Sequence, residues 1–219
     1  MDALTRRFWW NPNKREGRFL AWKDWDSLCC PRSEGGLGFK ISKTMNSALL
    51  AKLAWMIATK RDSLCMRILR AKYRVKDEWL SLDAARHASP VWKAIEKARG
   101  VVRKGACFII GDGKLVDVWL DLWVPWLNGF IPTPKDGSIV QSEMKVAQLI
   151  DFEQHTWRTS LLRNIFNTSA QAILSIRIPS TPCPDKLMWI TDSKGLFSIK
   201  SAYNQMISNT LSQASFAVI

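Results

Sequence analysis

Residues Trp22 to Phe39 read WKDWDSLCCPRSEGGLGF and bring two Trp, two adjacent Cys, one Pro and three Gly close together. Apolar residues recur at helical spacing from Phe19 to Leu28, which predicts a short helix with one buried face. Pro31 lacks an N–H group and disfavours the α region for the residue before it, so this helix should end at Cys29 or Cys30. We interpret the stretch as a docking segment.

The three glycines Gly35, Gly36 and Gly38 follow this helix. Glycine allows positive φ or a close backbone approach, and Leu37 and Phe39 could pack against such a turn. A phosphate-binding loop is the other interpretation of Gly-Gly-x-Gly. We reject it because the strand and the Lys-Ser/Thr terminus of a P-loop are not found around it.

Composition is compatible with one large domain or two small ones, because 219 residues with 47% hydrophobic content can build a core. The chain has 12 Trp but only 2 Tyr. Tryptophan brings a large buried area with one polar N–H to satisfy, so this ratio favours buried anchors.

The net charge of +13 is concentrated in the first half of the chain. Residues 1–110 contain 23 Lys and Arg against 10 Asp and Glu, whereas residues 111–219 contain 9 of each. This imbalance favours a polyanionic partner, RNA or DNA rather than a membrane, because the chain has no isolated basic amphipathic tail. A soluble basic domain without such a partner is the alternative.

Neither a metal nor another cofactor is expected. The five cysteines form no C-x-x-C pair and predict reduced, mostly buried thiols, and His87 and His155 have no Cys or carboxylate at ligand spacing. The sequence has no apolar run of about 18 residues, and its N-terminal apolar stretch is too short for a signal peptide. We expect an intracellular protein, the nucleus included, that is not secreted.

Three strong helices are predicted in the first half. The first, at about 45–58, is apolar nearly all round and capped by Ser42 or Thr44. The second runs from a cap at Asp62 or Ser63 to Tyr73, with Leu64, Cys65, Ile68 and Leu69 facing inward. The third starts at Ser89-Pro90 and reaches Lys104, with Val91, Ala94, Ile95, Ala98 and Val102 facing inward and Glu96 as the only outward acid.

Basic residues lie on the outward faces of the second and third helices. A solvated face and a phosphate-binding surface are both compatible with this pattern, and no acid is expected within reach of the first group. The candidate nucleic-acid-binding residues are Lys60, Arg67, Arg70, Arg74, Lys93, Lys97, Arg103 and Lys104.

Two β-hairpins are predicted, one around the turn Gly111–Lys114 and one around the turn Asp192–Gly195. The four flanking runs could pair into one small sheet. Asp112, Asp117 and Asp121 near the first turn could bind Mg²⁺ or act as acid and base, but turn and strand-edge positions explain them better.

Shorter elements complete the plan. Modest helices are predicted at 144–150, 156–166 and 169–174, and a last helix from Ser201 toward Leu211. The predicted regions are a docking segment at 1–41, basic helices at 42–104, a hairpin with a Trp cluster at 105–128, a loop at 129–142, short helices with the second hairpin at 143–211, and a tail at 212–219.

Several motifs carry a family resemblance. They are FWW at 8–10, the run W-x2-W-D-x-L-C-x-P-x-S-E-G-G-L-G-F at 22–39, N-x-A-L-L-A-K-L-A-W at 46–55, I-L-x-A-K-Y at 68–73, S-P-V-W-K-x-I at 89–95, I-G-D-G-K at 110–114, V-W-x-D-x-W-x-P at 118–125, I-L-S-I at 173–176, P-D-K-L-x-W at 184–189 and G-x-F-S-I-K-S-A-Y at 195–203. In this order the chain resembles the C-terminal region of plant LINE-type, non-LTR retrotransposon reverse transcriptases that carry a reverse transcriptase zinc-binding domain.

The resemblance implies a region between the polymerase thumb and the zinc-binding domain, with the first turn of the latter. In that family the polymerase uses an aromatic-Ala-Asp-Asp motif, and the chain has no Asp-Asp dipeptide, so we expect no enzyme. Asn11 stands where the family usually has Gly. Phe108, Ile109 and Ile110 replace a more basic strand, which weakens a nucleic-acid role for the first hairpin.

Together these observations predict a mainly α-helical α+β fold with two β-hairpins, a basic helical lobe and a hairpin-containing lobe. The first hypothesis is a non-catalytic, retroelement-derived region that binds RNA or DNA without sequence preference or acts as a scaffold. The alternative is a protein-interaction module, or a gene remnant, whose Trp22, Trp25, Trp119, Trp123 and Trp126 surfaces contact other parts of the parent polyprotein.

Overall fold

The computed structural model describes residues 1–13, 17–76, 79–81, 88–135 and 143–216. Helices dominate it, with two small two-stranded antiparallel sheets, which confirms the α+β class. The elements are α1 (Asp2–Trp10), α2 (Trp25–Cys29), η1 (Arg32–Glu34), α3 (Ser42–Ala58), α4 (Leu64–Tyr73), α5 (Pro90–Arg103), β1 (Ala106–Ile109), η2 (Asn128–Phe130), η3 (Val146–Leu149), β2 (Ile150–Asp151), β3 (Thr156–Trp157), α6 (Thr159–Ile165), α7 (Ser169–Leu174), β4 (Lys186–Trp189) and α8 (Ile199–Phe216).

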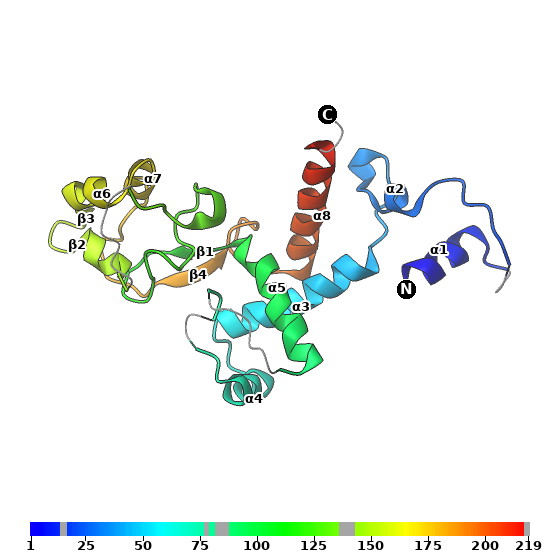
Figure 1. Ribbon diagram of the computed structural model, residues 1–219, viewed down its shortest axis with the longest axis horizontal. Coiled ribbons are helices and arrows are strands. Elements are labelled where there is room, and N and C mark those ends of the chain that lie inside the picture. Colours follow the sequence, from blue (N-terminus) through cyan, green and yellow to red (C-terminus); the bar gives the residue numbers. More distant parts are fainter. Residues whose placement is uncertain (14–16, 77–78, 82–87, 136–142, 217–219) are drawn as a thin grey trace.

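In Figure 1, α1 and α2 lie at one end, α6 and α7 at the other, and α3, α5 and α8 between them. The predicted loop at 129–142 falls partly outside the described residues. Of the predicted tail at 212–219, residues 212–216 are described, and they continue α8. Within the described residues, no helix is both long and apolar enough to cross a membrane. The predicted region boundaries stay predictions.

The first hydrophobic core forms where α3 packs against α5 and α8. Ala48, Ala51 and Ala54 are fully buried on α3, and their small side chains let the neighbouring helices approach closely. Large aromatic rings fill the remaining space: Tyr73 stacks on Trp92 with ring centroids 4.1 Å apart. The nearly all-apolar sequence of α3 is explained by this central position.

The pairing of the strands differs from the two predicted hairpins. β1 pairs with β4, and the register sets Ala106 opposite Trp189 and Ile109 opposite Lys186. Each strand thus pairs with a segment about 80 residues away. The turns after them are present, but the runs that follow, at 115–120 and 196–200, form no strand ladder. The expectation that the two predicted hairpins share one sheet is confirmed for one run of each, because β1 belongs to the first hairpin and β4 to the second.

A second core forms from residues 110–176 and contains the buried rings of Trp123, Trp157 and Phe166. The indole N–H of Trp123 donates to the Val118 carbonyl at 3.0 Å, and that of Trp157 donates to the Ile176 carbonyl at 2.7 Å. Buried tryptophans with a satisfied N–H are the anchors that the composition predicts. The predicted helix at 144–150 is only the 3₁₀ turn η3, and the one at 156–166 starts at Thr159.

The docking segment has a small core of its own around Trp25, Leu28 and Cys29. α2 ends at Cys29, as predicted, but it begins only at Trp25 and not near Phe19, and Trp22 is exposed. Phe39 stacks on Trp25 with centroids 5.3 Å apart. Gly35 and Gly38 have positive φ. A Cβ on Gly36 would lie 2.0 Å from the Cys30 carbonyl oxygen, so the close approach predicted for these glycines is confirmed.

The start of α3 is capped from a distance rather than locally. Neither Ser42 nor Thr44 caps it, so that prediction is wrong; the N-cap is Ile41 and makes no side-chain bond. Instead the Asp2 carboxylate on α1 accepts from the Ser42 N–H at 2.9 Å. A hydrogen bond from the Ser42 side chain, and then the one from this N–H, hold the pKa of Asp2 below its usual value. The Ile41 N–H donates to the Tyr203 hydroxyl at 3.0 Å and ties the segment to α8. α1 itself has no counterpart among the elements predicted from the sequence.

The inward face of α4 was predicted wrongly. Leu64 is 68% exposed and Ile68 is 56% exposed, whereas Met66 is fully buried. Leu69 and Tyr73, three and seven residues after Met66, pack against the first core. The predicted inward residues and the residues that are in fact buried both recur at helical spacing, so the sequence of α4 fits either face. The position of α3 determines which face is buried. On α5, Val91 is exposed and Glu96 is buried, again opposite to the prediction.

The cysteines are free, but they are not mostly buried as predicted. Cys65 and Cys183 are exposed, Cys30 is intermediate, and Cys29 and Cys107 are buried. Burial raises the pKa of the Cys107 thiol to about 12. Burial, with the nearby Asp2 carboxylate, raises that of Cys29 to about 11. Both buried thiols therefore stay protonated at neutral pH and serve as apolar core residues.

Candidate nucleic-acid interface

The candidate basic residues divide into two kinds. Two arginines bind the backbone of the chain itself: an Arg70 guanidinium N–H donates to the Ile57 carbonyl at 2.9 Å, and one from Arg103 donates to the Leu80 carbonyl at 2.8 Å. The second kind extends into solvent. Lys60, Arg67, Arg74, Lys93, Lys97 and Lys104 are exposed.

One expectation about the α4 face is wrong. The Asp62 carboxylate lies 3.4 Å from Arg67 Nε, so an acid is within reach of that face. Both side chains are highly exposed, and such surface pairs contribute little to stability. Arg74 is the C-cap residue of α4 and has a left-handed backbone conformation, with φ 46°.

A groove collects basic side chains from both halves of the chain. Two cavities, of about 450 and 90 Å³, share the lining residues Ala58, Lys60, Phe108 and Asp121 and therefore adjoin each other. We call the two cavities together the lysine groove. Its basic lining residues are Lys60, Arg70, Lys76, Lys114, Lys145 and Lys186.

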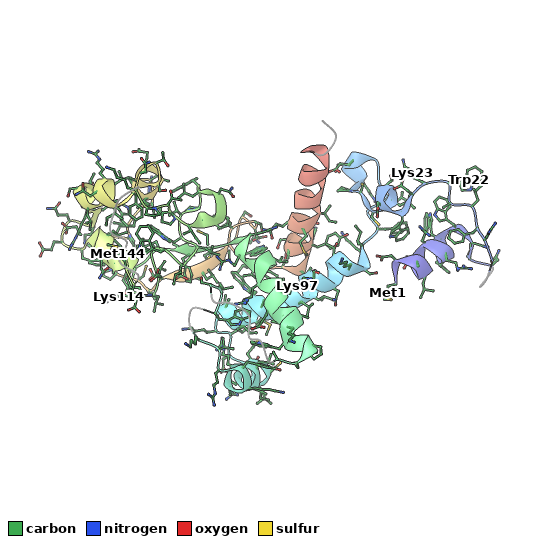
Figure 2. The ribbon with its side chains drawn as sticks, in the orientation of Figure 1. Met1, Trp22, Lys23, Lys97, Lys114 and Met144 are labelled. Carbon is green, nitrogen blue, oxygen red and sulfur yellow. The ribbon has the colours of Figure 1, made fainter. Side chains whose placement is uncertain are left out.

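Of the candidate residues, only Lys60 and Arg70 line the lysine groove. Arg103 and Lys104 line a separate, more open cavity of about 940 Å³. Lys97 lies on α5, well apart from Lys114 (Figure 2). The structure does not bring the candidate residues together as one continuous track.

The wall of the groove that carries Lys114 is held by one buried carboxylate. Asp185 accepts from the Gly111 N–H at 2.7 Å, from the Gly113 N–H at 2.9 Å and from the Leu115 N–H at 3.0 Å. Three charge-assisted hydrogen bonds fix the turn, and with it the neighbouring lysine. Asp185 is the residue before Lys186, so the same contact also places the first residue of β4.

The three aspartates near this turn have structural contacts. Asp117 Oδ1 accepts from the N–H groups of Trp119 and Leu120, and Asp121 Oδ2 accepts from the Asp117 N–H. Asp112 Oδ1 accepts from the Lys114 N–H at 3.2 Å. Among the described residues, no group of three or more His, Cys, Asp and Glu side chains could hold a metal ion.

Among the described lining residues, basic side chains outnumber acidic ones. Six are basic and two are acidic, Asp121 and Asp185, and the Asp185 charge is compensated by its three N–H donors. Two of the lysines also have acidic neighbours outside the groove: Lys114 lies 3.4 Å from Asp112, and Lys145 lies 3.8 Å from Asp117. The floor is apolar, with the half-buried Phe108 and the buried Leu187.

Sequence reasoning missed Lys76, Lys114, Lys145 and Lys186. A signal for two of them was present, because Lys114 ends the motif I-G-D-G-K and Lys186 lies in P-D-K-L-x-W. Asp185, in the second motif, accepts hydrogen bonds from the turn in the first motif, so the two motifs are in contact in the folded chain. Nothing in the sequence indicates Lys145.

Comparison with known proteins gives two relatives in Arabidopsis thaliana. The chain is 34% identical over 126 residues to an uncharacterized mitochondrial protein, a match that covers 56% of this chain and 79% of that protein. The chain belongs to the same family as this mitochondrial protein. It is also 30% identical over 217 residues to a protein named provisionally as a ribonuclease H protein; this match covers 94% of the chain and 34% of that protein.

The chain thus spans about a third of the length of the relative named for ribonuclease H. One relative is named for ribonuclease H, and the name of the other states no function. No family model matches the chain, and no solved structure matches it.

Proposed function

We propose that the chain is a non-catalytic region of a LINE-type, non-LTR retrotransposon reverse transcriptase, the part leading into the zinc-binding domain, and that it binds the phosphate backbone of RNA or DNA. The lysine groove carries the proposal. Its Lys114, Lys145 and Lys186 come from three separate segments and border one cavity. Such convergence of ammonium groups suits a chain of phosphates.

Binding should be independent of base sequence. Lysine ammonium groups act as point charges toward phosphate and lack the planar fork with which arginine reads guanine. Among the described residues, Arg70 is the one arginine that lines the groove, and it already donates to the Ile57 carbonyl. Phosphate contacts of this kind supply affinity and salt dependence without a base code.

The proposal predicts a specific change in salt dependence. In the double variant Lys114→Gln and Lys186→Gln, two phosphate contacts are lost while both apolar stems remain. For a single strand, log K decreases with log salt, and the steepness of this decrease should be smaller by about 1.4, since each lost contact contributes about 0.7. Fluorescence anisotropy of a labelled oligonucleotide, titrated from ~50 to ~200 mM salt, measures this slope.

Lys23→Gln is the matched control. Lys23 is exposed and lies at the opposite end of the molecule from Lys114 (Figure 2), so its loss should leave affinity and slope unchanged. Lys97→Gln tests the α5 face in the same assay. Wild-type protein that fails to bind at low salt, or a double variant that keeps the wild-type slope, would contradict the proposal.

Two exposed tryptophans favour a second candidate, a protein-interaction module. Of the five tryptophans considered for this role, Trp25 and Trp123 are buried, but Trp22 is 81% exposed and Trp126 is 61% exposed. Leu20, close to Trp22 in sequence, is 68% exposed. Apolar residues this exposed are typical of surfaces that bind another protein.

This candidate predicts concentration-dependent self-association or dye binding. Replacing Trp22 by Ser should lower the binding of a hydrophobic dye by about half if the Leu20 and Trp22 surface dominates it. Dye fluorescence and sedimentation velocity measure the change, with Trp126→Ser as the comparison. Dye binding equal to that of the wild type in both variants would exclude these tryptophans as the contact surface.

A further inference from the structure

We infer that the lysine groove binds unpaired, single-stranded nucleic acid, with phosphates on its lysines and a base against its apolar floor, and that it discriminates against duplex. This inference rests on the proposed function. It adds the substrate class, which charge alone does not determine, because single strands and duplexes both present phosphates.

The lining separates into a charged rim and an apolar floor. Lys60, Lys114 and Lys186 are exposed, while Leu187 is buried and Phe108 is half-buried between the two cores. Leu115 is 61% exposed and extends the apolar surface toward solvent. Phosphates alone would make no favourable contact with this apolar area, whereas the apolar face of a base can pack against it.

The size of the groove is appropriate for one nucleotide and its neighbours. The larger cavity, of about 450 Å³, falls within the range of about 300–1,000 Å³ seen for pockets that enclose a small organic ligand. In a duplex the base faces are stacked inside the helix, so a duplex could reach only the lysine rim. In a single strand a base can turn out of the stack and contact an aromatic side chain.

The walls of the groove are held by contacts within the chain itself. The Asp185 carboxylate holds the turn from Gly111 to Leu115 through three N–H groups, and β1 pairs with β4 along the floor. Lys145 Nζ lies 3.4 Å from the Leu115 carbonyl and joins the turn to the segment before η3. A preformed site loses little conformational entropy on binding.

The test compares four length-matched probes: unpaired RNA, unpaired DNA, duplex DNA, and an abasic DNA strand that has phosphates but no bases. Both unpaired strands should bind at least about tenfold more tightly than the duplex and about fivefold more tightly than the abasic strand, because only they offer base faces. The RNA and DNA arms show which sugar is preferred.

Two variants identify the floor. Phe108→Leu and Leu115→Ala should each weaken binding of the unpaired strand about threefold or more and leave binding of the abasic strand unchanged. Phe108 belongs to both cores, so its variant is checked by thermal unfolding; Leu115 is exposed and its variant should fold as the wild type.

Two outcomes separate this inference from the proposed function. Duplex or abasic probes that bind as tightly as the unpaired strands, with a normal salt dependence, would overturn the inference and leave phosphate binding intact. If none of the four probes binds at low salt, both the inference and the proposed function fail.

Discussion

Replacing Asp185 by Ala is expected to destabilise the protein by about 3–5 kcal/mol. The carboxylate is 8% exposed and accepts from three backbone N–H groups. Alanine leaves these donors without an acceptor, and those of Gly111 and Gly113 are buried. Urea unfolding followed by tryptophan fluorescence measures the loss, because the Trp123 and Trp189 rings are fully buried.

Asp185→Asn is the matched control for this prediction. Its amide oxygen can replace Oδ1 and keep the bonds to Gly111 and Gly113, but an amide NH₂ then faces the Leu115 N–H. We expect a smaller loss of about 1–2 kcal/mol. Both variants should also bind nucleic acid more weakly, since the turn carries Lys114. An Asp185→Ala protein within ~0.5 kcal/mol of the wild type would show that the turn does not need this carboxylate.

Gly111→Ala is expected to cost about 2–4 kcal/mol, for a steric reason. A Cβ at this position would lie 2.0 Å from the Cys183 carbonyl oxygen and 2.8 Å from the Cys183 and Pro184 carbonyl carbons. These atoms are backbone, so no side chain can turn away. The backbone segments at Gly111 and at Cys183 must move apart, and the hydrogen bond from the Gly111 N–H to the Asp185 carboxylate is then lost.

Gly100→Ala is the comparison that removes the same conformational freedom without the clash. Gly100 is exposed in the interior of α5, and a Cβ there meets nothing within 4 Å. Alanine is the better helix former, so this variant should be more stable by about 0.5–1 kcal/mol. Urea midpoints that shift in the same direction for both variants would contradict the steric explanation.

Helix positions in the first half followed from short-range signals. Ser63 and Ser89 cap α4 and α5 as predicted, accepting from the N–H groups of Met66 and Trp92. Caps and prolines act within a few residues, so they can be recognised without the fold. α1 was missed because its N-cap residue, Met1, makes no side-chain capping hydrogen bond.

The basic residues show the limit of charge counting. The excess of positive charge in residues 1–110 predicts a basic surface on α4 and α5. The groove instead draws Lys114, Lys145 and Lys186 from the half of the chain that has no net charge. Two of the α4 and α5 arginines, Arg70 and Arg103, hold backbone carbonyls. A count over a segment does not record which side chains share a surface.

The local sequence was sufficient for the α+β class, the approximate positions of α3, α4 and α5 and the glycine turn after α2, because helix periodicity, caps and glycine turns depend on neighbours within one or two turns of chain. The partner of β1, the inward face of α4 and the assembly of the lysine groove depend on residues far apart in sequence. Asp185 meets the turn at Gly111 across more than 70 residues. Such contacts form only when the packed cores bring the segments together, so no local pattern records them.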